Sequence, residues 1–123
     1  MQRIKIGLLT VLMAVFTLTA CANNAPVPST LLTQAEGNVE QARSLNAEKF
    51  APLAFRDAQK NLEKAQAALA KKENAEAREW LEKSVADSEL AIAQSHAKKS
   101  EQAADQVEEN LRALEQEVKK NQQ

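Results

Sequence analysis

Apolar side chains in the last third of the chain recur at alternating intervals of four and three residues. No proline or glycine interrupts the sequence from Ala75 onward. Such a heptad pattern is typical of one face of a long helix that packs against another helix. We therefore expect a helix over residues 75–118. The positions of this seam are Ala86, Leu90, Ala93, Ala97, Ser100, Ala104, Val107, Leu111, Leu114 and Val118.

A second helical pattern precedes the first one, over residues 52–72. Pro52 suits the first turn of a helix, where its missing N–H group costs nothing. Only Glu73 and Asn74 separate the two helices, and so short a connection makes them antiparallel. Asn74 is expected to adopt left-handed backbone geometry or to cap the last helix. The apolar positions of this second pattern are Phe55, Ala58, Leu62, Ala65 and Leu69.

A further helix is expected nearer the N-terminus, over residues 31–48, with a break at 49–52. Thr33 and Glu36 have the spacing of a capping box, and Ser29 or Thr30 could cap the helix earlier. The apolar positions that share one face of this helix are Leu32, Ala35, Val39, Ala42 and Leu45.

The lengths of these helices predict the shape of the molecule. At 1.5 Å per residue, the last helix is about 66 Å long and each of the others about 30 Å or less. The shorter helices can cover only the first half of the long one. The seam from about Ser100 to Val118 should therefore project without a partner in the chain. We expect an all-α fold, a helical hairpin or small three-helix bundle, with a coiled-coil-like arm.

Composition supports the helical interpretation and excludes several classes of protein. The chain has 123 residues, of which 23 are alanine, 2 are glycine and none is tyrosine. A β-sandwich or barrel would need more β-branched and aromatic residues and more glycine at its turns. A single cysteine cannot form a disulfide within the chain. The formal charge of −1 gives no electrostatic basis for binding nucleic acid.

Residues 1–20 have the features of a secretory signal peptide: basic Arg3 and Lys5, a short apolar run, and small residues before a cleavage site. The sequence Leu18-Thr19-Ala20-Cys21 resembles the lipobox of bacterial lipoproteins. The resemblance implies diacylglycerol on Cys21, cleavage before it, and acylation of its new amine by a fatty acid such as palmitate. An ordinary signal peptide that happens to contain a cysteine is the alternative.

The residues after Cys21 bear on localisation. No aspartate follows Cys21 directly, so the familiar signal for retention in the inner membrane is absent. By that resemblance we expect a lipid anchor in the outer membrane, at its periplasmic face. Residues 21–30 contain Pro26 and Pro28 and are expected to form the lipidated end and a linker. Residues 31–123 then make up the helical domain.

The only histidine, His96, supplies no catalytic or metal-binding set. Its neighbour Ser95 does not face it on a helix, so no nucleophilic triad is indicated. No Glu-x-x-His motif occurs, because residue 93 is alanine. We expect no enzymatic activity, no metal and no cofactor other than the covalent lipid on Cys21.

A family resemblance extends from about Ser29 to Ala97. It rests on Phe50-Ala51-Pro52, Ala58, Leu62, Ala65, Leu69, Ala75, Ala77, Leu81 and the segment from Ala86 to Ala91. In these residues the chain resembles a family of short, alanine-rich bacterial envelope lipoproteins of unknown function, whose domain also occurs ahead of OmpA-like domains. The resemblance implies an envelope location and a helical fold, and it supplies no catalytic residues.

Together these features predict a non-enzymatic scaffold, spacer or adaptor that acts through helix–helix contacts at the seam over residues 86–118, with a helical protein or another copy. The expected partner-binding residues are Ala104, Val107, Leu111, Leu114 and Val118. Two alternatives remain open. One is a cell-wall-associated structural lipoprotein, although a terminal lysine for attachment to peptidoglycan is missing. The other is a binding module or holdase for apolar ligands, with a groove around Phe55, Trp80 and Leu81.

Overall fold

A computed structural model describes residues 25–122, which form four helices and contain no strand. These are α2 (Ser29–Ser44), the single turn α3 (Ala47–Phe50), α4 (Pro52–Ala70) and α5 (Asn74–Asn121). The predicted all-α fold with a long C-terminal helix is confirmed. The predicted signal peptide and Cys21 lie outside the described residues.

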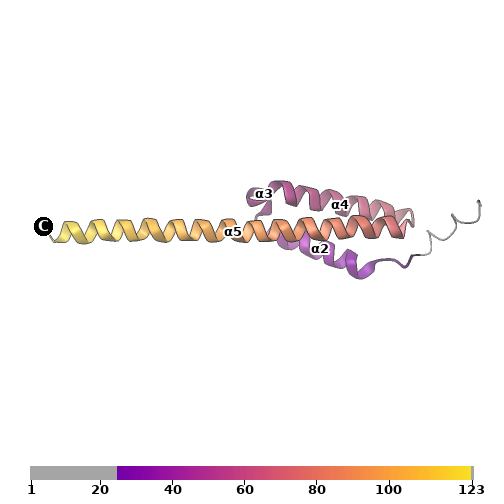
Figure 1. The fold of residues 1–123 in the computed structure, drawn as a ribbon, viewed down its shortest axis with the longest axis horizontal. Helices are drawn as coiled ribbons and strands as arrows, with labels where there is room; N and C mark the ends of the chain where they lie inside the picture. The colour runs from indigo at the N-terminus through magenta and orange to yellow at the C-terminus, as the bar shows by residue number, and fades with distance from the viewer. Residues whose placement is uncertain (1–24, 123) are drawn as a thin grey trace, which may run out of the picture.

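Helix α5 is the central element of the molecule, and the other helices pack along it (Figure 1). It has 48 residues, whereas α4 has 19 and α2 has 16. Both shorter helices pack along the first half of α5, and α4 makes the more extensive interface. They touch each other much less. The second half of α5 extends alone beyond this bundle, as Figure 1 shows in yellow.

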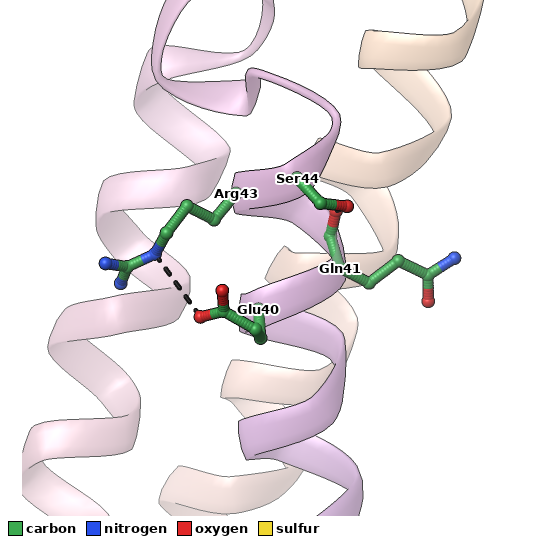
Figure 2. Close-up of polar contacts among 4 residues, drawn as sticks. All are labelled: Glu40, Gln41, Arg43 and Ser44. Carbon is green, nitrogen blue, oxygen red and sulfur yellow. Dashed lines mark hydrogen bonds and ion pairs between the residues drawn. The ribbon is translucent and has the colours of Figure 1, made fainter.

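The end of α2 differs from the predicted helix over 31–48. The helix stops at Ser44, because Asn46 adopts left-handed backbone with φ of 60°, a conformation that asparagine tolerates well. The one-turn helix α3 then follows. In the last turn of α2, the Ser44 hydroxyl donates to the carbonyl oxygen of Gln41 at 2.7 Å. Arg43 Nε lies 3.5 Å from Glu40 Oε2 there (Figure 2).

The start of α2 also departs from the predicted caps. The helix begins at Ser29, with Pro28 in the capping position and no side-chain cap. Thr33 is already inside the helix, where its hydroxyl donates to the carbonyl oxygen of Ser29 at 3.1 Å. The predicted capping box of Thr33 and Glu36 is therefore wrong, because the helix starts four residues before Thr33.

The corner between α4 and α5 is a Schellman motif centred on Lys72, not on Asn74 as predicted. Lys72 has φ of 63°, and its N–H donates to the Leu69 carbonyl oxygen. The Glu73 N–H donates back to the Ala68 carbonyl oxygen, which completes the motif. Asn74 is the first residue of α5, and its side chain instead donates to the Ala25 carbonyl oxygen at 2.7 Å.

The core is made mainly of small side chains. One cluster surrounds Phe55, and the other surrounds Leu81. The buried hydroxyl groups are satisfied, since Ser84 donates across the interface to the Ala58 carbonyl oxygen at 2.9 Å and Ser95 donates to Ala91 at 2.7 Å. Small side chains let helix backbones approach closely, so few large residues are needed. The buried residues of α5 are Ala77, Leu81, Ser84, Ser88, Ala91 and Ser95.

The face of α5 that packs in the bundle is not the predicted seam. Ala86, Leu90, Ala93 and Ala97 are exposed, although the seam would have to be buried there to hold the bundle. Each buried residue from Ser84 to Ser95 lies two positions before a seam residue. Two positions correspond to about 200° around a helix, which places the seam on the outer side of α5.

Candidate helix-docking surface

The seam therefore forms one continuous exposed stripe along α5, which we call the outer seam. It comprises the ten heptad positions from Ala86 to Val118. It begins on the side of the bundle that faces away from α2 and α4, and it continues along the arm, the part of α5 from Ser100 onward. Its large side chains keep about half of their surface exposed: 49% for Leu90, 57% for Val107 and 56% for Leu111. Since scattered single apolar residues are normal on a surface, the unusual feature is their alignment on one face.

All five predicted partner-binding residues lie on the outer seam within the arm. Every described residue from Ser100 onward is exposed, so nothing within residues 25–122 covers this part of the helix. Leu114 and Val118 keep 57% and 53% of their surface exposed. The structure thus brings these side chains together on one open face, and their role in binding stays a prediction. The predicted residues on that face are Ala104, Val107, Leu111, Leu114 and Val118.

Sequence reasoning named the seam over residues 86–118 as a surface for helix–helix contact, but it did not identify which side of α5 packs within the bundle. Ala86, Leu90, Ala93 and Ala97 were expected to face the shorter helices, but they continue the exposed stripe of the arm. The signal that identifies the packed face is a second heptad series, two positions earlier. This series does not stand out in the sequence because several of its members are serines, which a hydrophobicity pattern counts as polar. Serines such as Ser84 can nevertheless be buried, because their hydroxyl groups donate to backbone carbonyl oxygens.

The ion pairs on this part of α5 both lie within the helix. Arg112 pairs with Glu108, and Lys98 pairs with Glu101. The hydrogen bond to Glu101 and the negative charge of that carboxylate raise the pKa of Lys98. Ion pairs at so exposed a helix surface contribute little to stability, because water and salt screen them. They leave the apolar stripe of the arm uncovered.

Two further pairs of opposite charge with i,i+4 spacing, Glu79–Lys83 and Glu115–Lys119, form no ion pair among the described residues. Lys83 lies over the ring of Trp80 instead of pairing with Glu79, with its Nζ 4.3 Å from the ring centroid. Lys119 makes no ion pair with Glu115 in this part of the chain. A cation above an aromatic face is a competing partner of similar strength to an exposed ion pair.

The large side chains of the bundle do not line a common groove. Phe55 is 2% exposed and Leu81 is fully buried, so both serve the core. Trp80 is half-buried between Lys64 and Lys83, and the Lys64 Nζ lies 3.8 Å from its ring centroid. Its indole N–H donates to Glu76 Oε1 at 3.1 Å. Phe55 therefore packs in the core, whereas Trp80 lies at its edge.

The remaining candidate chemistry is sparse in residues 25–122. His96 is exposed, and its side chain makes no hydrogen bond or ion pair to the described part of the chain. No three His, Cys, Asp or Glu side chains gather closely enough there to hold a metal ion. None of the helices formed by these residues combines the length and apolar character needed to cross a bilayer.

Comparisons with known proteins give one family and no individual relative. A family model described as "Domain of unknown function (DUF4398)" matches residues 30–107. The matched segment runs from the start of α2 to Val107 on the outer seam, so it covers the bundle and the first part of the arm. Neither the search of curated proteins nor that of solved structures gave a match.

Proposed function

The chain belongs to the DUF4398 family, whose description assigns no activity, and from the geometry of α5 we propose a non-enzymatic adaptor or spacer of the bacterial envelope. The protein would be held by lipid on Cys21 at the periplasmic face of the outer membrane. It would act through helix–helix contacts made by the arm. The proposal names a way of working, and the predicted lipobox supplies the location.

The observation that carries this proposal is an aligned apolar stripe on a helix that leaves its own bundle. Four Val or Leu residues on the arm keep more than half of their surface exposed. Complete burial of such a side chain is worth ~1.5–3 kcal/mol, so about half of that remains to be gained at each position. A second helix along this face would recover that free energy. The four residues are Val107, Leu111, Leu114 and Val118.

The position of Ala25, where the described residues begin, supports a role for α5 as a spacer between the membrane and the tip of the arm. Asn74 binds the carbonyl oxygen of Ala25 and thereby fixes the start of the described chain beside the first residue of α5. Cys21 lies four residues earlier, which is at most ~14 Å of extended chain. A lipid on Cys21 would therefore hold the corner end near the membrane. With a length of about 72 Å, α5 would carry the tip of the arm deep into the periplasm.

The alternative of a binding module for apolar ligands has less support. Such a module needs a concave apolar site, usually lined by accessible aromatic side chains. Phe55 and Leu81 are buried in the core, and Trp80 is flanked by two lysines. We therefore favour the adaptor.

The direct test is site-specific photo-crosslinking in living cells. A photoreactive residue placed at Val107 or Leu114 should form covalent adducts with a protein, because both positions lie on the outer seam. The matched control is Gln116, which is exposed on the same arm but belongs to the opposite side of α5. Adducts at Gln116 equal to those at Leu114, or none at either seam position, would contradict the proposed docking role.

The anchor needs a separate test. The variant Cys21→Ser should lose its membrane association and appear in the soluble periplasmic fraction, since two or three acyl chains are what would hold the protein to lipid. If this variant fractionates with membranes as the wild type does, the predicted lipid anchor is wrong.

A further inference from the structure

We propose that the outer seam binds the outer seam of a second copy of this chain, with the two α5 helices parallel and in register over residues 86–118. This inference rests on the proposed docking function of the arm and names the partner. Four features support it: the position of the seam on α5, the sizes of its side chains, the charges beside it, and the place of Ala25 next to the first residue of α5.

The position of the seam leaves room for a second long helix along its full length. Helices α2 and α4 pack on the opposite side of α5, and so they do not obstruct the seam even where it passes behind the bundle. Ala86 and Leu90 are as open to a partner as the residues of the arm. Two copies could therefore pair back to back, with both bundles facing outward.

The layers of the seam match themselves in a parallel arrangement. In register, each seam residue meets the same residue of the second copy. The small side chains from Ala93 to Ala104 then meet small side chains, and the two helices can approach closely there. The large side chains from Val107 to Val118 meet large ones and fill the wider part. A continuous spacing of 3.5 residues also suits a left-handed pair of helices.

Charges beside the seam disfavour the antiparallel arrangement. When two seams overlap fully in opposite directions, Leu90 faces Leu114 of the other copy. Asp87 then lies beside Glu115 of the other copy, and Glu89 lies beside Glu117. Both contacts bring like charges together, which is destabilising at the flanks of paired helices.

The parallel arrangement avoids both of these contacts. In a parallel pair, the residue just before Ala97, Ala104 or Leu111 lies beside the residue that is five positions further along the sequence of the other copy. His96 then meets Glu101, Ala103 meets Glu108 and Asn110 meets Glu115. None of these pairs joins two like charges, and the flanks of the seam from His96 to Glu115 therefore favour a second copy in this direction. At the bundle end, Asp87 would lie beside Glu82 of the other copy.

The position of Ala25 relative to α5 also favours the parallel arrangement. Ala25 is held beside Asn74 at the corner end of α5, so copies anchored through the preceding residues would present their arms in the same sense. Confinement to one membrane surface also raises the effective concentration of one copy around another. Both effects favour a parallel pair over an antiparallel one.

Cysteine crosslinking of the full chain in isolated membranes tests this arrangement. Single variants Leu90→Cys, Leu111→Cys and Val118→Cys should each give a disulfide-linked homodimer after mild oxidation, because equal positions meet all along a parallel seam. Gln102→Cys and Gln116→Cys are exposed controls on the other side of α5 and should give at least fivefold less. The unmodified chain controls for Cys21, its only native cysteine.

The outcomes separate the pairing from the docking function. A fourth variant, Ser100→Cys, lies on the seam near the centre of its length, where equal positions meet in an antiparallel pair as well as in a parallel one. Crosslinks confined to Ser100→Cys indicate an antiparallel pair and overturn the proposal. The absence of homodimers at all three seam positions overturns it too. If photo-crosslinking at Val107 still captures a different protein in that case, the docking function stands while self-pairing falls. If neither method yields a seam adduct, both proposals fall.

Discussion

The bundle half and the arm half of α5 share one heptad spacing but place their apolar residues on opposite sides of the helix. Within the bundle, the packed side carries alanine, serine and Leu81. In the arm, the same side continues with polar residues such as Gln102 and Glu109. The other side changes from mostly alanine behind the bundle to valine and leucine in the arm.

This difference explains where the bundle ends and why the helix continues. Packing against α2 and α4 needs small side chains on one side of α5, and that supply stops after Ser95. Beyond it, large apolar side chains appear on the opposite side, where neither shorter helix can reach. The first half of α5 is therefore stabilised from within the chain, whereas nothing within residues 25–122 covers the second half, for which we propose a partner.

The largest difference should come from the same substitution made in each half. Leu81→Ala should lower the free energy of unfolding by about 3 kcal/mol, because a fully buried leucine is lost and a cavity is left. Leu111→Ala, at a half-exposed position, should change it by less than about 0.5 kcal/mol in the unpaired chain. Urea unfolding followed by the fluorescence of Trp80 reports on the bundle in both variants. Equal effects would refute the contrast between the halves.

A smaller effect is expected from the buried hydroxyl of Ser84. Ser84→Ala removes the hydrogen bond to the Ala58 carbonyl oxygen and should cost about 1 kcal/mol of unfolding free energy. Ser100→Ala removes a hydroxyl from the exposed seam and should be neutral or slightly stabilising, because alanine is the better helix former. The same unfolding measurement applies, and a neutral Ser84→Ala would show that this contact adds nothing.

In the corner between α4 and α5, we expect one substitution to raise the free energy of unfolding rather than lower it. Lys72→Gly should raise the stability of the bundle by about 0.5–1 kcal/mol, because glycine accepts the left-handed backbone of that position without strain. Lys71→Gly, at a position with ordinary right-handed geometry, should instead lower the stability. Thermal unfolding of the two variants decides the matter, and a gain from Lys71→Gly would contradict the assigned motif.

The sequence predicted the helical class, the antiparallel corner and the projecting arm, because these follow from proline and glycine positions and from helix lengths. It did not predict the packed side of α5. Two heptad series share this helix, and hydrophobicity alone favours the one with Leu90 and Leu111. The series that packs is recognisable only when helix approach and bonds such as that from Ser84 are known.

The predicted docking residues illustrate the same limit. Their exposure followed from simple lengths, since α2 and α4 are too short to reach Leu111 or Val118. The exposure of the seam from Ala86 to Ala97 did not follow, because it depends on which side of α5 the shorter helices cover. The left-handed residues Asn46 and Lys72 also escaped prediction, because tertiary packing selects among several permitted turn positions.

Amide hydrogen exchange along α5 tests the central contrast most directly. The protein would be extracted from membranes in mild detergent, in its wild-type form and as the Leu111→Glu/Leu114→Glu variant. We predict slow exchange over residues 77–95 in both, and slow exchange over 104–118 in the wild type only. Equal protection of residues 104–118 in both forms would contradict the claim that the arm is stabilised by a partner along its apolar stripe.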